Sequence, residues 1–84
     1  MAKKVVMYAT DWCGYCARAR ALLTRKGVAF EEIDVDVVPS AYQEMREKSG
    51  RGSVPQIFIG GEPIGGCDEL LALESQGRLD AMLQ

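Results

Sequence analysis

Histidine is missing from this 84-residue chain, and so are long apolar runs and blocks of basic residues. A zinc site takes four ligands, mostly from His and Cys, so three cysteines without any histidine argue against one. The apolar runs fall far short of the roughly 20 residues that span a bilayer, which argues against a membrane protein. A net charge of −2, with no basic patch in the sequence, argues against nucleic acid as a partner.

The small number of cysteines also bears on the compartment. Secreted disulfide scaffolds of this size carry more cysteines and pair them, whereas this chain has three, an odd number. The apolar run 5–9 that follows Lys3 and Lys4 is shorter than the apolar region of a secretory signal. Length and composition predict a single domain over residues 1–84 with one modest core. We therefore expect a cytoplasmic protein whose thiols are kept for chemistry.

Two of the cysteines form the motif Cys13-Gly14-Tyr15-Cys16, which follows a strand-like run and begins a helix-like one. On a helix, side chains three positions apart have Cβ atoms about 5–6 Å from each other, within modest adjustment of disulfide geometry. Cys13 would face the unpaired N–H groups and positive dipole of the helix start, which favour the reactive thiolate. We predict that Cys13 is a redox nucleophile and Cys16 its resolving thiol. A purely structural bridge is disfavoured, because closing so short a loop stabilises a chain by only about 2 kcal/mol.

Apolar periodicity and turn residues predict strands at 4–9, 28–35, 56–59 and 62–64 and helices at 14–26, 39–49 and 67–76. A short turn carrying Leu79, Met82 and Leu83 follows. Strand, helix and strand in succession predict a parallel first pair of strands, and Gly60-Gly61 predicts a hairpin between the last two. In the second helix we expect Ala41, Met45 and Tyr42 to point inward. The order of elements predicts an α/β protein with a thioredoxin-like fold, its four-stranded mixed sheet flanked by three or more helices.

Three segments at matching spacing carry a family resemblance: Cys13 to Cys16, Ser49 to Ile59, and Ile64 to Leu70. With them the chain resembles the dithiol class of the glutaredoxins, and within that class the bacterial glutaredoxin 3 type. The resemblance implies a glutathione-dependent thiol–disulfide oxidoreductase that reduces glutathionylated mixed disulfides and protein disulfides, ribonucleotide reductase among its partners. It also implies a monomer that uses glutathione as co-substrate and holds no permanent cofactor.

The resemblance further implies a glutathione-binding site. The residue matching Val54 offers its backbone to the cysteinyl part of glutathione, as an added strand would, and the residue matching Pro55 has a cis peptide bond beside the thiols. The start of the last helix receives the γ-glutamyl carboxylate on its N–H groups. The residues assigned to the site in this way are Tyr15, Ser53, Val54, Pro55, Gly66, Cys67 and Asp68. Cys67 is interpreted as a small helix-start residue rather than a catalyst.

Two positions depart from the family pattern. Many glutaredoxins have a Lys, which binds the glycyl carboxylate of glutathione, where this chain has Thr10, and a Gln or Arg where it has Tyr42. Thr10 and Arg51 are the remaining possible contacts for that carboxylate. A lost charge-assisted hydrogen bond costs about 1.5–3 kcal/mol, so we expect weaker glutathione binding.

Neighbours of the thiols support two alternative functions. Gly14 stands where many members have Pro, and loss of that Pro is associated with a [2Fe–2S] cluster held between two subunits by their N-terminal cysteines and two glutathiones. Cys13 would be the metal ligand in such a carrier or sensor. Trp12 precedes the motif as a Trp does in thioredoxins, which suggests a thioredoxin-like hydrogen donor. Arg18 and Arg20 either lower the pKa of Cys13 or are simply solvated.

Overall fold

Four strands and four helices follow one another in the computed structural model, which describes residues 3–84. They are β1 (Val5–Ala9), α1 (Gly14–Arg25), β2 (Glu31–Asp34), α2 (Ala41–Ser49), β3 (Gln56–Ile59), β4 (Glu62–Gly65), α3 (Cys67–Ser75) and α4 (Leu79–Leu83). Every predicted strand and helix is present. Within residues 3–84 no helix is both long and apolar enough to cross a membrane.

The strands form one mixed sheet in the order β2-β1-β3-β4. β1 and β2 are parallel, as the strand–helix–strand pattern predicted, and β3 is antiparallel to both β1 and β4. Gly60 and Gly61 make the β3–β4 turn with φ of +59° and +84°, values that a side chain disfavours and glycine adopts freely. Pro63 lies on β4, an edge strand of this order, where proline is tolerated because an edge strand pairs on one side only.

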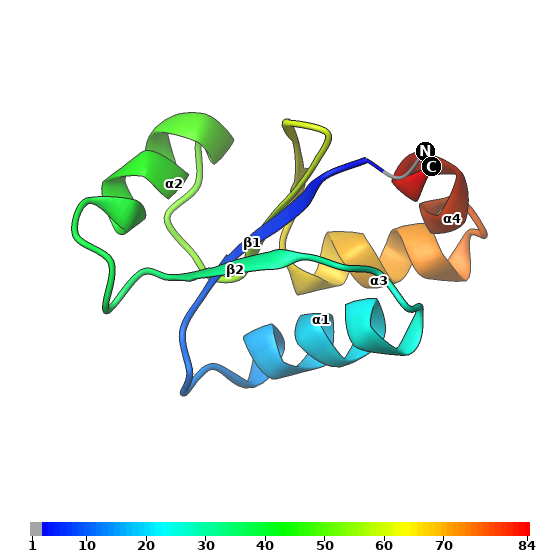
Figure 1. Ribbon diagram of the computed structural model, residues 1–84, viewed down its shortest axis with the longest axis horizontal. Helices are drawn as coiled ribbons and strands as arrows, with labels where there is room; N and C mark the ends of the chain where they lie inside the picture. Colours follow the sequence, from blue (N-terminus) through cyan, green and yellow to red (C-terminus); the bar gives the residue numbers. More distant parts are fainter. Residues whose placement is uncertain (1–2) are drawn as a thin grey trace.

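Helices cover the two faces of the sheet unequally (Figure 1). α1 and α3 lie together on one face, and α4 closes its end, where the Lys3 N–H donates to the Leu83 carbonyl at 3.0 Å. This face holds the main core, made of Val5, Met7, Ala9, Cys16, Ala19, Leu22, Leu23, Ile57, Ile59, Cys67, Leu70, Leu79 and Leu83. α2 covers the other face, where Met45 packs in a smaller cluster with Tyr8 and Phe58. The alternation of side chains along β1 thus supplies both cores.

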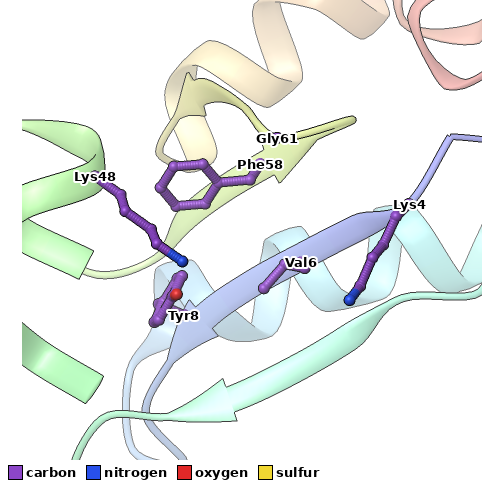
Figure 2. A pocket seen from close by; sticks show the side chains of 6 residues that line it. All are labelled: Lys4, Val6, Tyr8, Lys48, Phe58 and Gly61. Carbon is purple, nitrogen blue, oxygen red and sulfur yellow. The ribbon is translucent and has the colours of Figure 1, made fainter. Parts of the chain in front are cut away.

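α2 leaves part of its face of the sheet uncovered. A hollow of about 380 Å³ remains there, lined by Lys4, Val6, Tyr8, Lys48, Phe58 and Gly61 (Figure 2). The rings of Tyr8 and Phe58 meet edge to face at 5.6 Å between centroids, and the Tyr8 hydroxyl donates to Glu44 at 2.8 Å. The lining of this hollow includes no cysteine.

Three local predictions were wrong, each for a physical reason. β2 begins at Glu31 rather than at residue 28, because the Val28 N–H is used by the Leu23 carbonyl at the end of α1. α2 begins only at Ala41, because Ser40 has a left-handed φ of +66°. The expected turn at the end of the chain is the helix α4, whose Leu79 and Leu83 are buried one helical turn apart.

Tyr42 was also predicted wrongly. It does not point into the core but is 43% exposed, and its hydroxyl donates to the Gly52 carbonyl at 2.9 Å. Tyr42 thus ties α2 to the loop that leads into Pro55. The inward positions of Ala41 and Met45 are confirmed.

Candidate functional site

Cys13, the first cysteine of the motif, lies at the end of the loop between β1 and α1. Cys13 is the N-cap of α1, with extended backbone (φ −88°, ψ 121°), and its Sγ accepts the Cys16 N–H at 3.4 Å. The same sulfur lies 3.8 Å from the Val54 carbonyl, on the loop before β3. Cys13 is partly exposed, whereas Cys16 is fully buried on the inward face of α1. The motif therefore presents one thiol to solvent and holds the second behind it.

The two thiols differ in acidity as well as in exposure. Burial by itself would raise the pKa of Cys13, but N–H and S–H donation from Cys16, the Tyr15 N–H and the Arg20 charge outweigh it, so the pKa is lowered. Burial raises the pKa of Cys16 to about 11, the Cys13 charge adds to the rise, and the Thr10 backbone partly offsets it. Near neutral pH, Cys13 is the thiol that more readily becomes the nucleophilic thiolate.

Arg20 is held in place rather than freely solvated. Its guanidinium donates two hydrogen bonds to the Glu32 carboxylate, from Nε at 2.8 Å and from Nη2. This two-point contact fixes the charge of α1 beside β2, and from there the charge lowers the pKa of Cys13. Of the two roles predicted for Arg20, lowering the pKa of Cys13 is the one supported, rather than simple solvation. The charge of Arg18 acts on Cys67 instead, where it partly offsets the rise in pKa that burial causes.

Next to the thiols lies a groove of about 240 Å³ between the loop before β3 and the start of α3. The groove brings together eight residues singled out from the sequence and adds one that was not: Tyr15, Arg51, Ser53, Val54, Pro55, Gly66, Cys67, Asp68 and Glu69. The Val54–Pro55 peptide bond is cis, as the family resemblance implied.

Glu69 is the groove residue that the sequence analysis missed. Its Oε1 accepts the Gly66 N–H at 2.6 Å and the Arg51 Nη1 at 3.2 Å. A Glu at the third position of a helix commonly returns to the N-cap N–H in this way, so its spacing from Gly66-Cys67 was the available signal. Arg51, predicted as a possible contact for the glycyl carboxylate, lines the groove but is paired there with the Glu69 carboxylate.

Thr10 does not line the groove, contrary to the expectation that it could meet a ligand carboxylate. Its side chain is 2% exposed, and its hydroxyl is buried without a hydrogen-bond partner among residues 3–84. Cys67 does line the groove but is 3% exposed. Burial, reinforced by the Asp68 charge, raises the pKa of Cys67, and both features oppose a role as nucleophile.

The fold and this arrangement of thiols define a class. A four-stranded mixed sheet with helices on both faces, a Cys-x-x-Cys motif at the first helix and a cis-proline loop facing it are the features of a thiol–disulfide oxidoreductase of thioredoxin-like fold. The glutaredoxin family model matches residues 5–64. The chain belongs to the glutaredoxin family.

Individual relatives agree with that assignment. The chain is similar to a glutaredoxin of Pseudomonas aeruginosa, at 54% identity over 94% of both chains. It is 49% identical to glutaredoxin 3 of Escherichia coli, over 95% of this chain and 96% of that one. Among solved structures, the buckwheat glutaredoxin–glutathione complex matches with a TM-score of 0.89 and 31% identity, over 96% of this chain and 76% of that one.

Proposed function

We propose that this protein is a glutathione-dependent disulfide reductase that works on glutathionylated substrates through Cys13. The observation that carries the proposal is the contrast between its two motif thiols. Cys13 is partly exposed with a lowered pKa, and Cys16 is buried with its pKa raised to about 11. A single accessible thiolate beside a groove is what attack on a small mixed disulfide requires.

In the proposed reaction, the Cys13 thiolate attacks the glutathione sulfur of a mixed disulfide. The bond between that sulfur and the substrate breaks, the substrate leaves as a thiolate that takes a proton from solvent, and glutathione is left joined to Cys13. A second glutathione thiolate then attacks the glutathione sulfur of this new disulfide. Glutathione disulfide leaves, and Cys13 returns to its thiolate form.

The groove offers a place for the glutathione moiety. The Val54 backbone borders the Cys13 sulfur at 3.8 Å and is suited to pairing with the cysteinyl backbone of glutathione. Tyr15 and Ser53 flank it. The N–H groups at the start of α3, with Asp68 beside them, suit the γ-glutamyl carboxylate and ammonium. Because Arg51 is already engaged by Glu69 at 3.2 Å and Thr10 is buried, we infer weak binding of the glycyl carboxylate.

For protein disulfides we propose a second route, in which Cys16 resolves the mixed disulfide between Cys13 and the substrate. The Cys16 sulfur attacks Cys13, the substrate thiolate leaves, and a Cys13–Cys16 bridge forms that two glutathiones reduce. Ribonucleotide reductase is a partner of this kind that the family implies. We propose that the protein is a monomer. We also propose that it works in the cytoplasm, where glutathione keeps thiols reduced.

Two single substitutions test the proposal. With a glutathionylated peptide as substrate and glutathione as reductant, Cys16→Ser should retain turnover and Cys13→Ser should abolish it. With a protein disulfide as substrate, both variants should fail. Turnover by Cys13→Ser would overturn the assignment of the nucleophile, and loss of both activities in Cys16→Ser would overturn the route that needs one thiol.

A cluster-holding dimer is the second function we propose to test, because Gly14, the residue after Cys13, faces open space. A Cβ built on Gly14 meets no atom within 4 Å. In residues 3–84 no three His, Cys, Asp or Glu side chains are grouped to hold a metal, so Cys13 would need ligands from glutathione and a second copy. Visible absorbance after reconstitution with iron, sulfide and glutathione supports this role, and a colourless monomer contradicts it.

The thioredoxin-like alternative differs from the proposed function in the reductant that it uses. A hydrogen donor of that kind is reduced by thioredoxin reductase with NADPH, whereas the proposed enzyme is reduced by glutathione. Reduction of the Cys13–Cys16 bridge by the flavoprotein alone would favour the alternative. Reduction by glutathione alone would reject it.

A further inference from the structure

An exposed apolar surface lies next to the reactive motif and takes no part in the groove. It consists of Trp12, Val37 and Val38, which are 75%, 72% and 45% exposed, and we call it the Trp12 patch. Trp12 directly precedes Cys13, while both valines come from the loop between β2 and α2. The Trp12 Nε1–H donates to Asp36 Oδ2 at 2.7 Å, and this hydrogen bond joins the two segments.

The valine loop is held in shape by its own backbone. The N–H groups of Val37 and Val38 donate to the Asp34 carbonyl at 3.2 and 2.9 Å, and the Asp36 N–H donates to Asp34 Oδ1 at 2.9 Å. The Ala41 N–H in turn donates to the Val38 carbonyl at 3.2 Å. A surface fixed in this way loses little conformational entropy when a partner covers it.

Isolated exposed apolar residues are common on protein surfaces. Here three lie on two segments that are hydrogen-bonded to each other, and Trp belongs to the residue types that dominate binding hot spots. A partner that presents an oxidised cysteine to Cys13 comes close to the adjacent exposed residue, Trp12. The Trp12 patch is therefore placed to contact the polypeptide around that cysteine.

The rim of the patch carries negative charge. The carboxylates of Asp11 and Asp36 are exposed, and neither forms an ion pair within residues 3–84. Arg20 is within electrostatic range of Asp11, but its guanidinium is held by Glu32. A partner covering the patch thus gains from apolar side chains at its centre and from Lys or Arg at its edge.

We propose that the Trp12 patch is the docking surface for protein substrates, and that it selects those whose oxidised cysteine is flanked by apolar and basic residues. The inference rests on the proposed function and adds a substrate class to it. Glutathione occupies the groove on one side of Cys13, and the substrate polypeptide occupies the Trp12 patch.

Two glutathionylated peptides of equal length test the proposal, one with Leu and Arg flanking the cysteine and one with Ser and Glu. We expect wild-type kcat/KM to be about tenfold higher for the Leu/Arg peptide, a difference of about 1.4 kcal/mol. The double variant Val37→Ser/Val38→Ser should lower this ratio at least about twofold, with Trp12 and the acidic rim accounting for what remains. Asp36→Asn should lower the preference in part, and added salt should lower it in the wild type.

Two controls make the outcome specific. Turnover of the mixed disulfide of glutathione and 2-mercaptoethanol, which cannot reach the patch, should be unchanged in the double variant. Leu71→Ser removes a 38% exposed apolar residue from α3 and should keep the peptide preference. Equal kcat/KM for the two peptides in the wild type, or an unaltered preference in the double variant, would overturn the docking surface alone. Absence of wild-type turnover on the small mixed disulfide would overturn the proposed function and this inference with it.

Discussion

The unequal acidity of the motif thiols gives a prediction that needs no physiological substrate. A thiol with the ordinary pKa of 9.0 is about 1% thiolate at pH 7, and one with a pKa of about 11 is about 0.01% thiolate. Because the pKa of Cys13 lies below 9.0, its thiolate fraction exceeds that of Cys16 by more than about 100-fold. The burial of Cys16, which is 0% exposed, increases the difference in reactivity further.

Alkylation with iodoacetamide, followed by peptide mass spectrometry, measures this difference directly. In the reduced wild-type protein, Cys13 should be alkylated at least about 100-fold faster than Cys16 at pH 7. Below the pKa of Cys13 its rate should fall tenfold per pH unit, because the thiolate is lost as the pH falls through that pKa. Cys67, also buried and with a raised pKa, serves as an internal reference that reacts slowly. Alkylation of Cys16 at a rate near that of Cys13 would refute the reasoning.

Three further substitutions probe the loops around the groove. Tyr42→Phe removes the hydrogen bond to the Gly52 carbonyl (2.9 Å) and should raise KM for the glutathionylated peptide with little change in kcat; an unchanged KM would mean that this bond does not position the loop. Gly65→Ala adds a Cβ about 2.7 Å from Glu69 Oε1 at a φ of +118°, and we expect urea unfolding to show a loss of about 1–3 kcal/mol. Glu69→Gln keeps an acceptor for the Gly66 N–H but releases the Arg51 charge. KM for the glutathionylated peptide should therefore fall. A rise in KM would show that Arg51 contributes to binding only when it is paired.

Most of the fold followed from local patterns in the sequence. The helical face of Cys16, Ala19, Leu22 and Leu23 is the buried face of α1, because the 3.6-residue period leaves one stripe for the core. The glycine pair fixed the β3–β4 turn. In both places local preference and tertiary packing favour the same structure, and such places are the ones that a single sequence predicts well.

The errors arose where an interaction distant in sequence decides the outcome. Tyr42 has the apolar character of a core residue, but its hydroxyl finds the Gly52 carbonyl ten positions away and stays at the surface. The place of Thr10, three positions before Cys13, predicts contact with a ligand carboxylate. In the fold, however, Thr10 directly follows β1 and is buried. Spacing signals the contact of Glu69 with the Gly66 N–H, but its pairing with Arg51 arises only when the folded chain brings the two within 3.2 Å. Neither periodicity nor spacing contains these pairings.

The site itself was predictable to a similar extent and for similar reasons. The spacing of Cys13 and Cys16 located the thiols, and the family resemblance located Val54 and Pro55 across from them. The sequence could not show that Arg20 is fixed by Glu32, because that contact joins α1 to β2. The Arg20 charge that this contact holds in place is one of the causes that lower the pKa of Cys13.

Trapping the first intermediate is the measurement that tests the central claim most directly. The Cys16→Ser variant, incubated with a glutathionylated peptide and then quenched with acid, should carry one glutathione, and tandem mass spectrometry should place it on Cys13. Added glutathione should release it as glutathione disulfide. Glutathione found on Cys67, or a peptide rather than glutathione joined to Cys13, would contradict the proposed mechanism.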